Sequence, residues 1–278
     1  MIKPTTRFVE FDNAPVVEVV CGVGFREIPI EVTQVGLLWL EFADEFPQPP
    51  REHPLPFRMP EQNRGVVDSA AFIAITKGAL RFPIPRVVFR SEDDTRLVQF
   101  ERDRFYFNWQ KTAAQPYPHF VAVYPAFELQ ASKFQQAVKN IVDHDAAPLW
   151  YELTYLNLIE KDHIWQDFSQ LGEVLRDFNW VPVNDRVLRR PTGVNWSTTF
   201  DLPCEAGRLH VAVRSVRDRE DTKDSLQIEL TARSPDVGEA GTPPARDAWF
   251  AVAHEQIVRG FADITTDRIQ REVWKRRV

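Results

Sequence analysis

The spacing of hydrophobic residues in the first half of the chain predicts strands and helices in a definite order. Residues 15–25 are rich in valine and carry only Glu18 in an otherwise apolar run, which is typical of a strand. Residues 32–46 place apolar side chains at helical spacing and end before Pro47, which predicts an amphipathic helix. Three strands follow, over residues 86–91, 96–101 and 104–109. A second amphipathic helix is predicted over residues 126–142.

The same order of elements returns in the second half. A strand is predicted over residues 150–159 and an amphipathic helix over residues 164–178. Three more strands are predicted, over residues 195–202, 208–217 and 226–233. The closing helix is expected to have Asp247 near its start as the N-cap and to run to Phe261. Because the order repeats, we expect an internal duplication, although the halves match in element order and not in residues.

These elements predict an α+β protein with two tandem β-α-β(3–4)-α halves. Their antiparallel strands are expected to form one continuous sheet with the helices packed on one face. The first half is expected to span residues 1–146 and the second residues 147–278. Residues 47–65 interrupt the pattern with six prolines, which disfavours regular structure. We expect a surface loop there, with a functional lid as the alternative.

Composition and charge restrict the class of protein. The net charge of −6 disfavours a general nucleic-acid binder, because that affinity comes from lysine and arginine on phosphates. No apolar run approaches the roughly 20 residues that cross a membrane, and no secretion signal is recognisable. Cys21 and Cys204 are the only cysteines, and two lone cysteines make neither a disulfide framework nor a zinc site. We therefore expect a cytoplasmic protein without a membrane partner.

Two motifs with known chemistry are incomplete. Gly22 and Gly24 lack the third glycine of a dinucleotide-binding fingerprint, and glycines in a strand favour a bulge or a close approach to the backbone. The pair His254-Glu255 lacks the second histidine of a zinc-protease helix, because position 258 is Val258. Neither motif predicts a bound nucleotide or zinc, and we expect no cofactor.

A possible metal site is weighed against a solvated helix end. Histidine and aspartate ligate divalent metals when several of them converge. The candidate ligands are Asp143, His144, Asp145 and His163. Histidine also gathers at helix C-termini, where the macrodipole favours a cation. We favour the helix end, and keep a metal-dependent hydrolase or nuclease as the alternative.

Arginines in the second half could bind an anion. The candidates on or beside one predicted strand are Arg208, Arg214 and Arg217. Such a face suits phosphate, an acidic partner or single-stranded nucleic acid. Acidic residues interleave with these arginines, so a charge-balanced solvated face is the favoured interpretation and nucleic-acid binding the alternative.

Aromatic residues in one strand predict a binding surface. Phe105, Phe107 and Trp109 share one face of that strand, and Tyr106 lies on the other. With Trp196, these residues indicate a sheet that is apolar on both faces. Helices would cover one face, and a second subunit, the other half or a ligand would cover the other. We therefore predict a partner- or ligand-binding face formed by Phe105, Phe107, Trp109 and Trp196.

Short stretches along nearly the whole chain occur in a recognisable order. They are residues 13–18 (NAPVVE), 104–105 (RF), 108–109 (NW), 117–118 (YP), 153–159 (LTYLNLI), 254–255 (HE) and 261–265 (FADIT). Together they resemble a sporadically distributed prokaryotic family of uncharacterised proteins. The family tends to have arginine where this chain has Thr154, which puts any site role of that arginine in doubt here. The resemblance implies no catalytic residues, and a sporadic distribution is typical of mobile or defence gene cassettes.

We therefore expect a non-enzymatic binding or scaffold protein. Its partner is expected to be a second copy in a homodimer or another protein, held on the aromatic sheet face. A small-molecule ligand in a groove is a further expectation. A metal-dependent hydrolase or nuclease and a nucleic-acid-binding protein are kept as alternatives.

Overall fold

A computed structural model describes residues 9–49, 51–53, 86–113, 115–181, 187–188, 190–217, 224–237 and 243–277. One antiparallel sheet of nine strands, in the order β3-β4-β5-β6-β2-β7-β10-β9-β8, forms the centre of the molecule. Its strands are β2 (Val16–Phe25), β3 (Arg51–His53), β4 (Arg86–Arg90), β5 (Arg96–Glu101), β6 (Arg104–Gln110), β7 (Pro148–Glu160), β8 (Asn195–Asp201), β9 (Arg208–Arg217) and β10 (Asp224–Arg233). The mixed α+β class and the large antiparallel sheet are confirmed.

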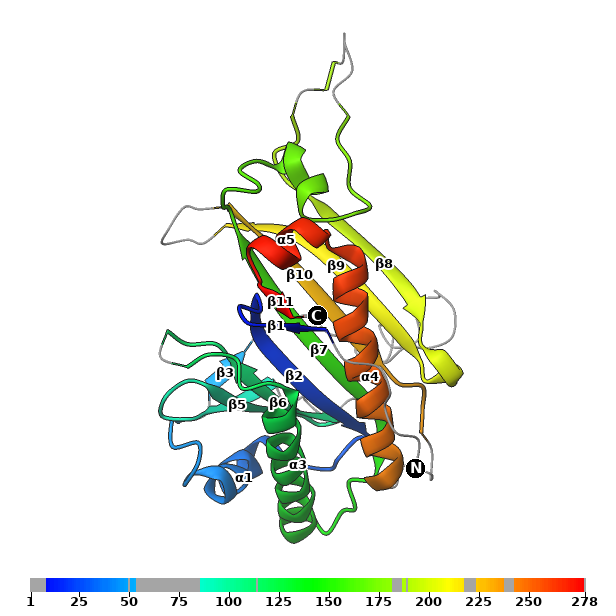
Figure 1. Ribbon diagram of the computed structural model, residues 1–278. Helices are drawn as coiled ribbons and strands as arrows, with labels where there is room; N and C mark the ends of the chain where they lie inside the picture. Colours follow the sequence, from blue (N-terminus) through cyan, green and yellow to red (C-terminus); the bar gives the residue numbers. More distant parts are fainter. Residues whose placement is uncertain are drawn as a thin grey trace.

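The helices are few. They are α1 (Val35–Phe42), α3 (Phe120–Val142), α4 (Pro243–Ile264) and α5 (Asp267–Glu272), with 3-10 turns η1 (Val32–Gln34), η2 (Phe168–Glu173) and η3 (Pro203–Glu205). Figure 1 shows α1, α3 and α4 on the same side of the sheet. A separate two-stranded ladder pairs β1 (Glu10–Phe11) with β11 (Arg276–Arg277), which brings the two ends of the described chain together.

The sheet joins the two halves of the chain through its central pair, β2 and β7, which run antiparallel. Outward from β2 the order is β6, β5, β4, and outward from β7 it is β10, β9, β8. The expected boundary at residues 146 and 147 lies between α3 and β7. A single hydrophobic core runs under both halves and includes Phe134 of α3 and Phe250 of α4. The halves therefore share one sheet and one core.

A β-bulge in β2 decides which of its side chains face the helices. The register pairs Val16 with Asn157 and then Glu18 with Leu156, so Val17 is the extra residue. Val16 belongs to the core under the helices. Glu18, two residues later, lies on the opposite face because the bulge shifts the alternation of side chains by one position.

The predicted strands are confirmed. Residues 96–101 and 208–217 form β5 and β9 with the predicted bounds. The other predicted strands have ends that differ by at most two residues. Period-two alternation and valine-rich runs identified most of them because those strands have at least one face in the core, whereas β8 is exposed or half-buried throughout.

Helix α3 begins at Phe120, ahead of the predicted start at residue 126. Pro125, which lacks the amide proton of the helical ladder, comes directly before the predicted start. It lies inside the helix on an exposed side, where water can reach the carbonyl group that its missing donor leaves unpaired. The amphipathic stripe predicted over residues 126–142 is confirmed within this longer helix.

The helix predicted over residues 164–178 is wrong. Only the 3-10 turn η2 forms there, with a non-helical Gln170 inside it. Asp162 accepts hydrogen bonds from the amides of Ile164 and Trp165, and Asp167 accepts one from Ser169. Such side-chain-to-backbone bonds compete with the helical ladder, so an apolar stripe alone did not produce a helix.

Two smaller predictions are also corrected. Asp247 is not an N-cap, because α4 already begins at Pro243; its carboxylate accepts a hydrogen bond from the Tyr124 hydroxyl at 2.7 Å. Residues 47–65 are not wholly irregular, because β3 forms at Arg51–His53 and pairs with β4. Residue 50 and residues 54–65 of that segment lie outside the described residues.

Candidate functional site

The sheet face opposite the helices carries a cleft with a volume of about 310 Å³. Six strands contribute to it, from β4 at one end through β5, β6, β2 and β7 to β10 at the other. Each strand supplies alternate residues, because successive side chains point to opposite faces of a sheet. The helix-side residues of the same strands fill the core, so this sheet-face cleft consists of the remaining, mainly polar half of each strand.

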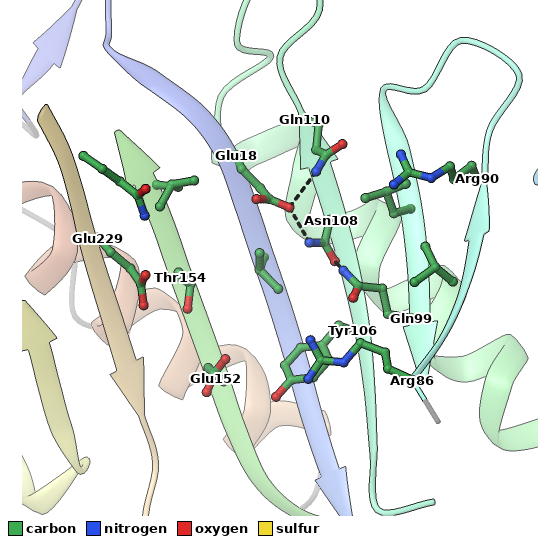
Figure 2. Close-up of a pocket in the computed structure, with 15 residues that line it drawn as sticks. Glu18, Arg86, Arg90, Gln99, Tyr106, Asn108, Gln110, Glu152, Thr154 and Glu229 are labelled. Carbon is green, nitrogen blue, oxygen red and sulfur yellow. Dashed lines mark hydrogen bonds between the residues drawn. The ribbon is translucent and has the colours of Figure 1, made fainter. Parts of the chain in front are cut away.

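Glu18 lies at the centre of an amide network in the cleft (Figure 2). Its Oε1 atom accepts hydrogen bonds from Asn108 Nδ2 at 2.5 Å and from Gln110 Nε2 at 3.0 Å. Gln99 Nε2 in turn donates to Asn108 Oδ1 at 2.8 Å. Among the described residues Glu18 has no cationic partner and its Oε2 atom accepts no hydrogen bond. The carboxylate is therefore oriented by neutral donors and keeps a free oxygen.

Two arginines of β4 lie at the other end of the cleft. Arg86 is neutralised by Glu101, which accepts from Nε at 2.8 Å and Nη2 at 2.7 Å. Arg90 has a weaker partner, Asp94, at 3.7 Å. Its Nε atom is buried and has no hydrogen-bond partner in the described part of the chain. The side chain as a whole is 25% exposed and lines the cleft, so its guanidinium meets the cleft with only this long ion pair as a partner.

The other acidic residues of the cleft are already paired. Glu152, which is 4% exposed, accepts from Arg233 Nε at 2.6 Å. Glu229 accepts from Arg214 Nη1 at 3.4 Å. Thr154 shares a 2.9 Å hydrogen bond with Thr231. These pairs stiffen the β7–β10 side of the cleft and leave Glu18 as its free negative charge.

Tyr106 forms part of the floor and explains Gly22. A Cβ atom at Gly22 would lie 2.5 Å from two carbon atoms of the Tyr106 ring, so the ring needs glycine beneath it. The absence of a side chain at Gly22 lets the Tyr106 ring pack closely against the backbone, which is one of the two structures predicted for this glycine. Burial raises the pKa of Tyr106, so its hydroxyl stays protonated at neutral pH. The cleft thereby gains a neutral hydrogen-bonding group.

The aromatic face predicted for binding lies elsewhere. Phe105, Phe107 and Trp109 are 0%, 2% and 4% exposed and belong to the core beneath the helices. Trp196 is partly buried and packs against Phe178, with ring centroids 5.1 Å apart. The prediction that these residues form an accessible partner face is corrected, because helix α3 packs on that side of β6. The predicted alternation of side chains along the strand is correct. The helices, however, cover the face with Phe105, Phe107 and Trp109, and the face with Tyr106 is the one that they leave open.

The arginines considered for anion binding each have an acidic partner. Arg214 pairs with Glu229, and Arg217 donates from Nε to Asp224 at 2.8 Å. Arg208 lies 3.8 Å from Asp201. These ion pairs agree with the charge-balanced face that the sequence favours for the described residues of β9. They give no support to the anion-binding alternative.

The four candidate metal ligands are not brought together. Asp143 and Asp145 both pair with Lys139, at 2.9 and 3.4 Å, at the end of α3. His163 lies 3.7 Å from Glu272. The length of β7 separates the two places, and thirteen residues at about 3.3 Å each span roughly 40 Å. No group of three or more metal-binding side chains occurs within the described ranges. The prediction that these residues form one metal site is therefore wrong.

Sequence reasoning missed the residues that form the cleft. Gln99, Asn108 and Gln110 are polar residues at alternate positions of two strands otherwise full of hydrophobic residues. That spacing was the available signal, because amides in the middle of a strand need partners on their own face. Arg90 gave no such signal, since its place in the cleft depends on the pairing of β4 with β5.

No protein-family model matches the chain. No curated protein matches it either. Among the described residues no helix has the length and apolar character needed to cross a membrane.

Proposed function

We propose that the protein is a binding protein that holds a short peptide in the sheet-face cleft. The observation that carries this proposal is the presence, in one cleft, of a carboxylate without a counter-ion among the described residues, Glu18, and a partly exposed guanidinium with only a 3.7 Å ion pair, Arg90. A peptide has the complementary groups, an ammonium at one end and a carboxylate at the other. Charge-assisted hydrogen bonds of this kind are the stronger class in proteins.

The spacing of the two charged residues favours a peptide over a free amino acid. Arg90 and Glu18 lie on β4 and β2, which are three strand spacings apart, or about 14 Å between backbones. The long arginine side chain shortens the gap that a ligand must bridge. Since an extended peptide gains about 3.3 Å per residue, two to four residues fit between the two groups.

The neutral groups between the charges suit a peptide backbone. Asn108, Gln99 and Gln110 carry amides, which both donate and accept hydrogen bonds as peptide groups do. Val20 and Leu97 add small apolar surfaces for side chains. The cleft volume of about 310 Å³ lies at the lower end of the range for small-ligand sites, which limits the ligand to a few residues.

Calorimetric titration with trialanine and its capped forms tests this proposal. Trialanine is expected to bind, and either N-acetylation or C-terminal amidation is expected to weaken binding about tenfold, because each removes one charge-assisted pair. Equal affinity for all three peptides, or no binding of any, would contradict the proposal.

Variants assign each end of the peptide. Glu18→Gln should lower the affinity for trialanine and remove the penalty of N-acetylation, while the penalty of amidation remains. Arg90→Gln should do the reverse. The matched control is Glu255→Gln, because Glu255 pairs with Arg259 on α4, away from the cleft. A variant at Glu255 that weakens binding as much as Glu18→Gln would point to a general charge effect.

We also propose that the chain forms a homodimer. Its support is apolar surface: Val32, Leu37 and Leu40, on η1 and α1, are 60%, 51% and 64% exposed. Sedimentation equilibrium is expected to give twice the chain mass of 32.2 kDa. A mass of one chain across the micromolar range would contradict the dimer.

We further propose that the chain contains an internal duplication, belongs to the family that it resembles and is located in the cytoplasm. The strand order supports duplication, because the first strand of each half is central and the last strand of that half pairs beside it. The stretches behind the family resemblance supply Glu18, Asn108 and Thr154 to the cleft, which supports a shared binding role.

A further inference from the structure

A larger cavity, of about 680 Å³, lies on the helix side of the sheet. Five parts of the chain enclose it: the segment from β1 to the start of β2, the first turn of α3, β7, α4 and the end of β11. Side chains of β7 alternate between the two sites, with Thr154 in the sheet-face cleft and Tyr155 in this interhelix cavity. The two sites are therefore separate and lie on opposite faces of one sheet.

Rings dominate the wall of the interhelix cavity. They belong to Phe11, Tyr117, Phe120, Tyr155, His254 and Phe261. Phe120 and His254 stack in parallel across α3 and α4, with centroids 4.2 Å apart and planes inclined by 11°. Phe11 meets Phe261 edge to face at 6.0 Å. Flat, polarisable walls of this kind favour flat ligands that stack or meet ring edges.

A pair of hydroxyl groups supplies the polar point of the cavity. Tyr117 Oη and Tyr155 Oη lie 2.8 Å apart, and one hydroxyl donates to the other. The pair has two protons and uses one of them internally, so the second proton is available to an acceptor. Burial raises the pKa of both tyrosines, which keeps both protons in place at neutral pH.

The interior of the cavity is uncharged. Burial lowers the pKa of His254 to about 4, so its ring is neutral at pH 7. The charged lining residues lie at the exposed edge of the cavity: Arg277, whose side chain is 66% exposed, forms ion pairs with Asp12 and, at 3.9 Å, with Glu10. Two carboxylates there meet one guanidinium, so an anion would lose its hydration without finding a free opposite charge, whereas a neutral ligand would not.

Backbone strain occurs beside the hydroxyl pair. His119, between Tyr117 and Phe120, has φ 63° and ψ 158°, a region that residues other than glycine rarely adopt. This conformation sets the positions of a ring on either side of it at the start of α3. Strained residues cluster at ligand-binding sites, where the surrounding structure holds them in place.

We infer that the interhelix cavity binds a flat, uncharged aromatic molecule carrying one oxygen that accepts a hydrogen bond, of the phenol or aryl-ketone class. The cavity volume falls within the range of about 300–1,000 Å³ for small-ligand sites. The rings provide stacking and edge contacts, the hydroxyl pair provides the single donor, and the neutral interior with its acidic edge rejects anions. The inference does not depend on the peptide proposal, because the two sites share no lining side chain.

Three probes of one shape test the ligand class: 2-naphthol, naphthalene and 2-naphthoate. Ligand-observed NMR on the full chain is expected to rank 2-naphthol first, naphthalene about tenfold weaker and 2-naphthoate weaker still. Naphthalene should bind more weakly than 2-naphthol because it lacks the hydrogen-bonding oxygen. 2-Naphthoate should bind more weakly still because its charge must be desolvated. No binding of 2-naphthol at millimolar concentration, or tightest binding of 2-naphthoate, would overturn the inference.

Variants locate the binding. Tyr117→Phe is expected to weaken 2-naphthol about tenfold and to leave naphthalene unchanged. The control is Tyr124→Phe, one turn along α3, because the Tyr124 hydroxyl donates to Asp247 and does not line the cavity. Val258→Trp, which fills the cavity from α4, should abolish binding of both neutral probes while circular dichroism and trialanine binding persist. Equal losses in the two tyrosine variants, or binding that survives Val258→Trp, would place the site elsewhere.

Discussion

Glu18 illustrates how a single residue receives its role from its neighbours. In the sequence it is an acidic interruption of a valine-rich run, a pattern that is common in strands. The bulge at Val17 turns it away from the core, and Asn108 and Gln110 then orient its carboxylate. The sequence predicted the strand but not this partnership, because the amides come from β6, roughly ninety residues along the chain.

Gly22 gives a direct test of the packing on the cleft floor. Gly22→Ala should destabilise the protein by about 1–3 kcal/mol, because the new methyl group would lie 2.5 Å from the Tyr106 ring. Gly36→Ala is the matched control: nothing lies within 4 Å of its new methyl group, and alanine in a helix should stabilise by about 0.5–1 kcal/mol. Urea unfolding of both variants measures the difference. Equal effects would mean that Tyr106 does not rest on Gly22.

His254 makes stability depend on pH. Its pKa is about 4 in the folded protein, because of burial, against 6.5 when unfolded. Between these values the unfolded chain binds a proton that the folded one does not, so stability falls as pH drops from about 6.5 to 4. The loss should be on the order of 2 kcal/mol.

Urea unfolding between pH 7 and pH 4.5 measures this loss. His254→Phe keeps a ring against Phe120 and should flatten the pH dependence in this window. An unaltered slope in His254→Phe would show that other groups cause the loss.

At the scale of elements, local pattern predicted strands well and short helices poorly. Most strands were predictable because they have a face in the core, so the period of two is visible in the sequence. Residues 164–178 have a helical stripe but form mostly turns, because Asp162 and Asp167 bond to nearby amides. The face of β6 that helices cover was not predictable, since alternation distinguishes two faces without saying which one is buried.

The turn between β4 and β5 supports Arg90 from one side. Asp93 Oδ1 accepts from Ser91 Oγ at 2.6 Å, Thr95 Oγ1 at 2.8 Å and the Thr95 amide at 3.1 Å. Asp93→Ala should therefore destabilise the protein by about 1–2 kcal/mol. Thermal or urea unfolding checks this value, and the exposed neighbour provides the control Glu92→Ala. Loss in both variants alike would show that the turn does not depend on the Asp93 carboxylate.

The same bonds predict an acid effect at this turn. Hydrogen bonds from Ser91 and Thr95 lower the pKa of Asp93 to about 2, from 3.8. Its stabilising contribution is complete above pH 3.8 and is lost as pH falls toward 2. Wild-type protein should therefore lose more stability than Asp93→Ala over that window, as measured by urea unfolding. Parallel curves for the two proteins would contradict the assignment.

At the scale of the whole molecule, one sheet separates two kinds of surface. The helix side holds the hydrophobic core and the interhelix cavity, and the opposite side holds the polar sheet-face cleft. The sequence predicted the α+β class and a single antiparallel sheet. It did not reveal the two sites, because the cleft is assembled from strands of both halves and the interhelix cavity from strands and helices of both halves.

The central claim is that the sheet-face cleft binds a short peptide, and the cleft offers its own reporters. The side-chain amides of Gln99, Asn108 and Gln110 give observable ¹H–¹⁵N signals in NMR spectra of the labelled full chain. Titration with trialanine should shift these three sets of signals together and in a saturable way, and Glu18→Gln should reduce the shifts. Signals of these amides that stay in place while others move, or a spectrum that does not change at all, would contradict the account.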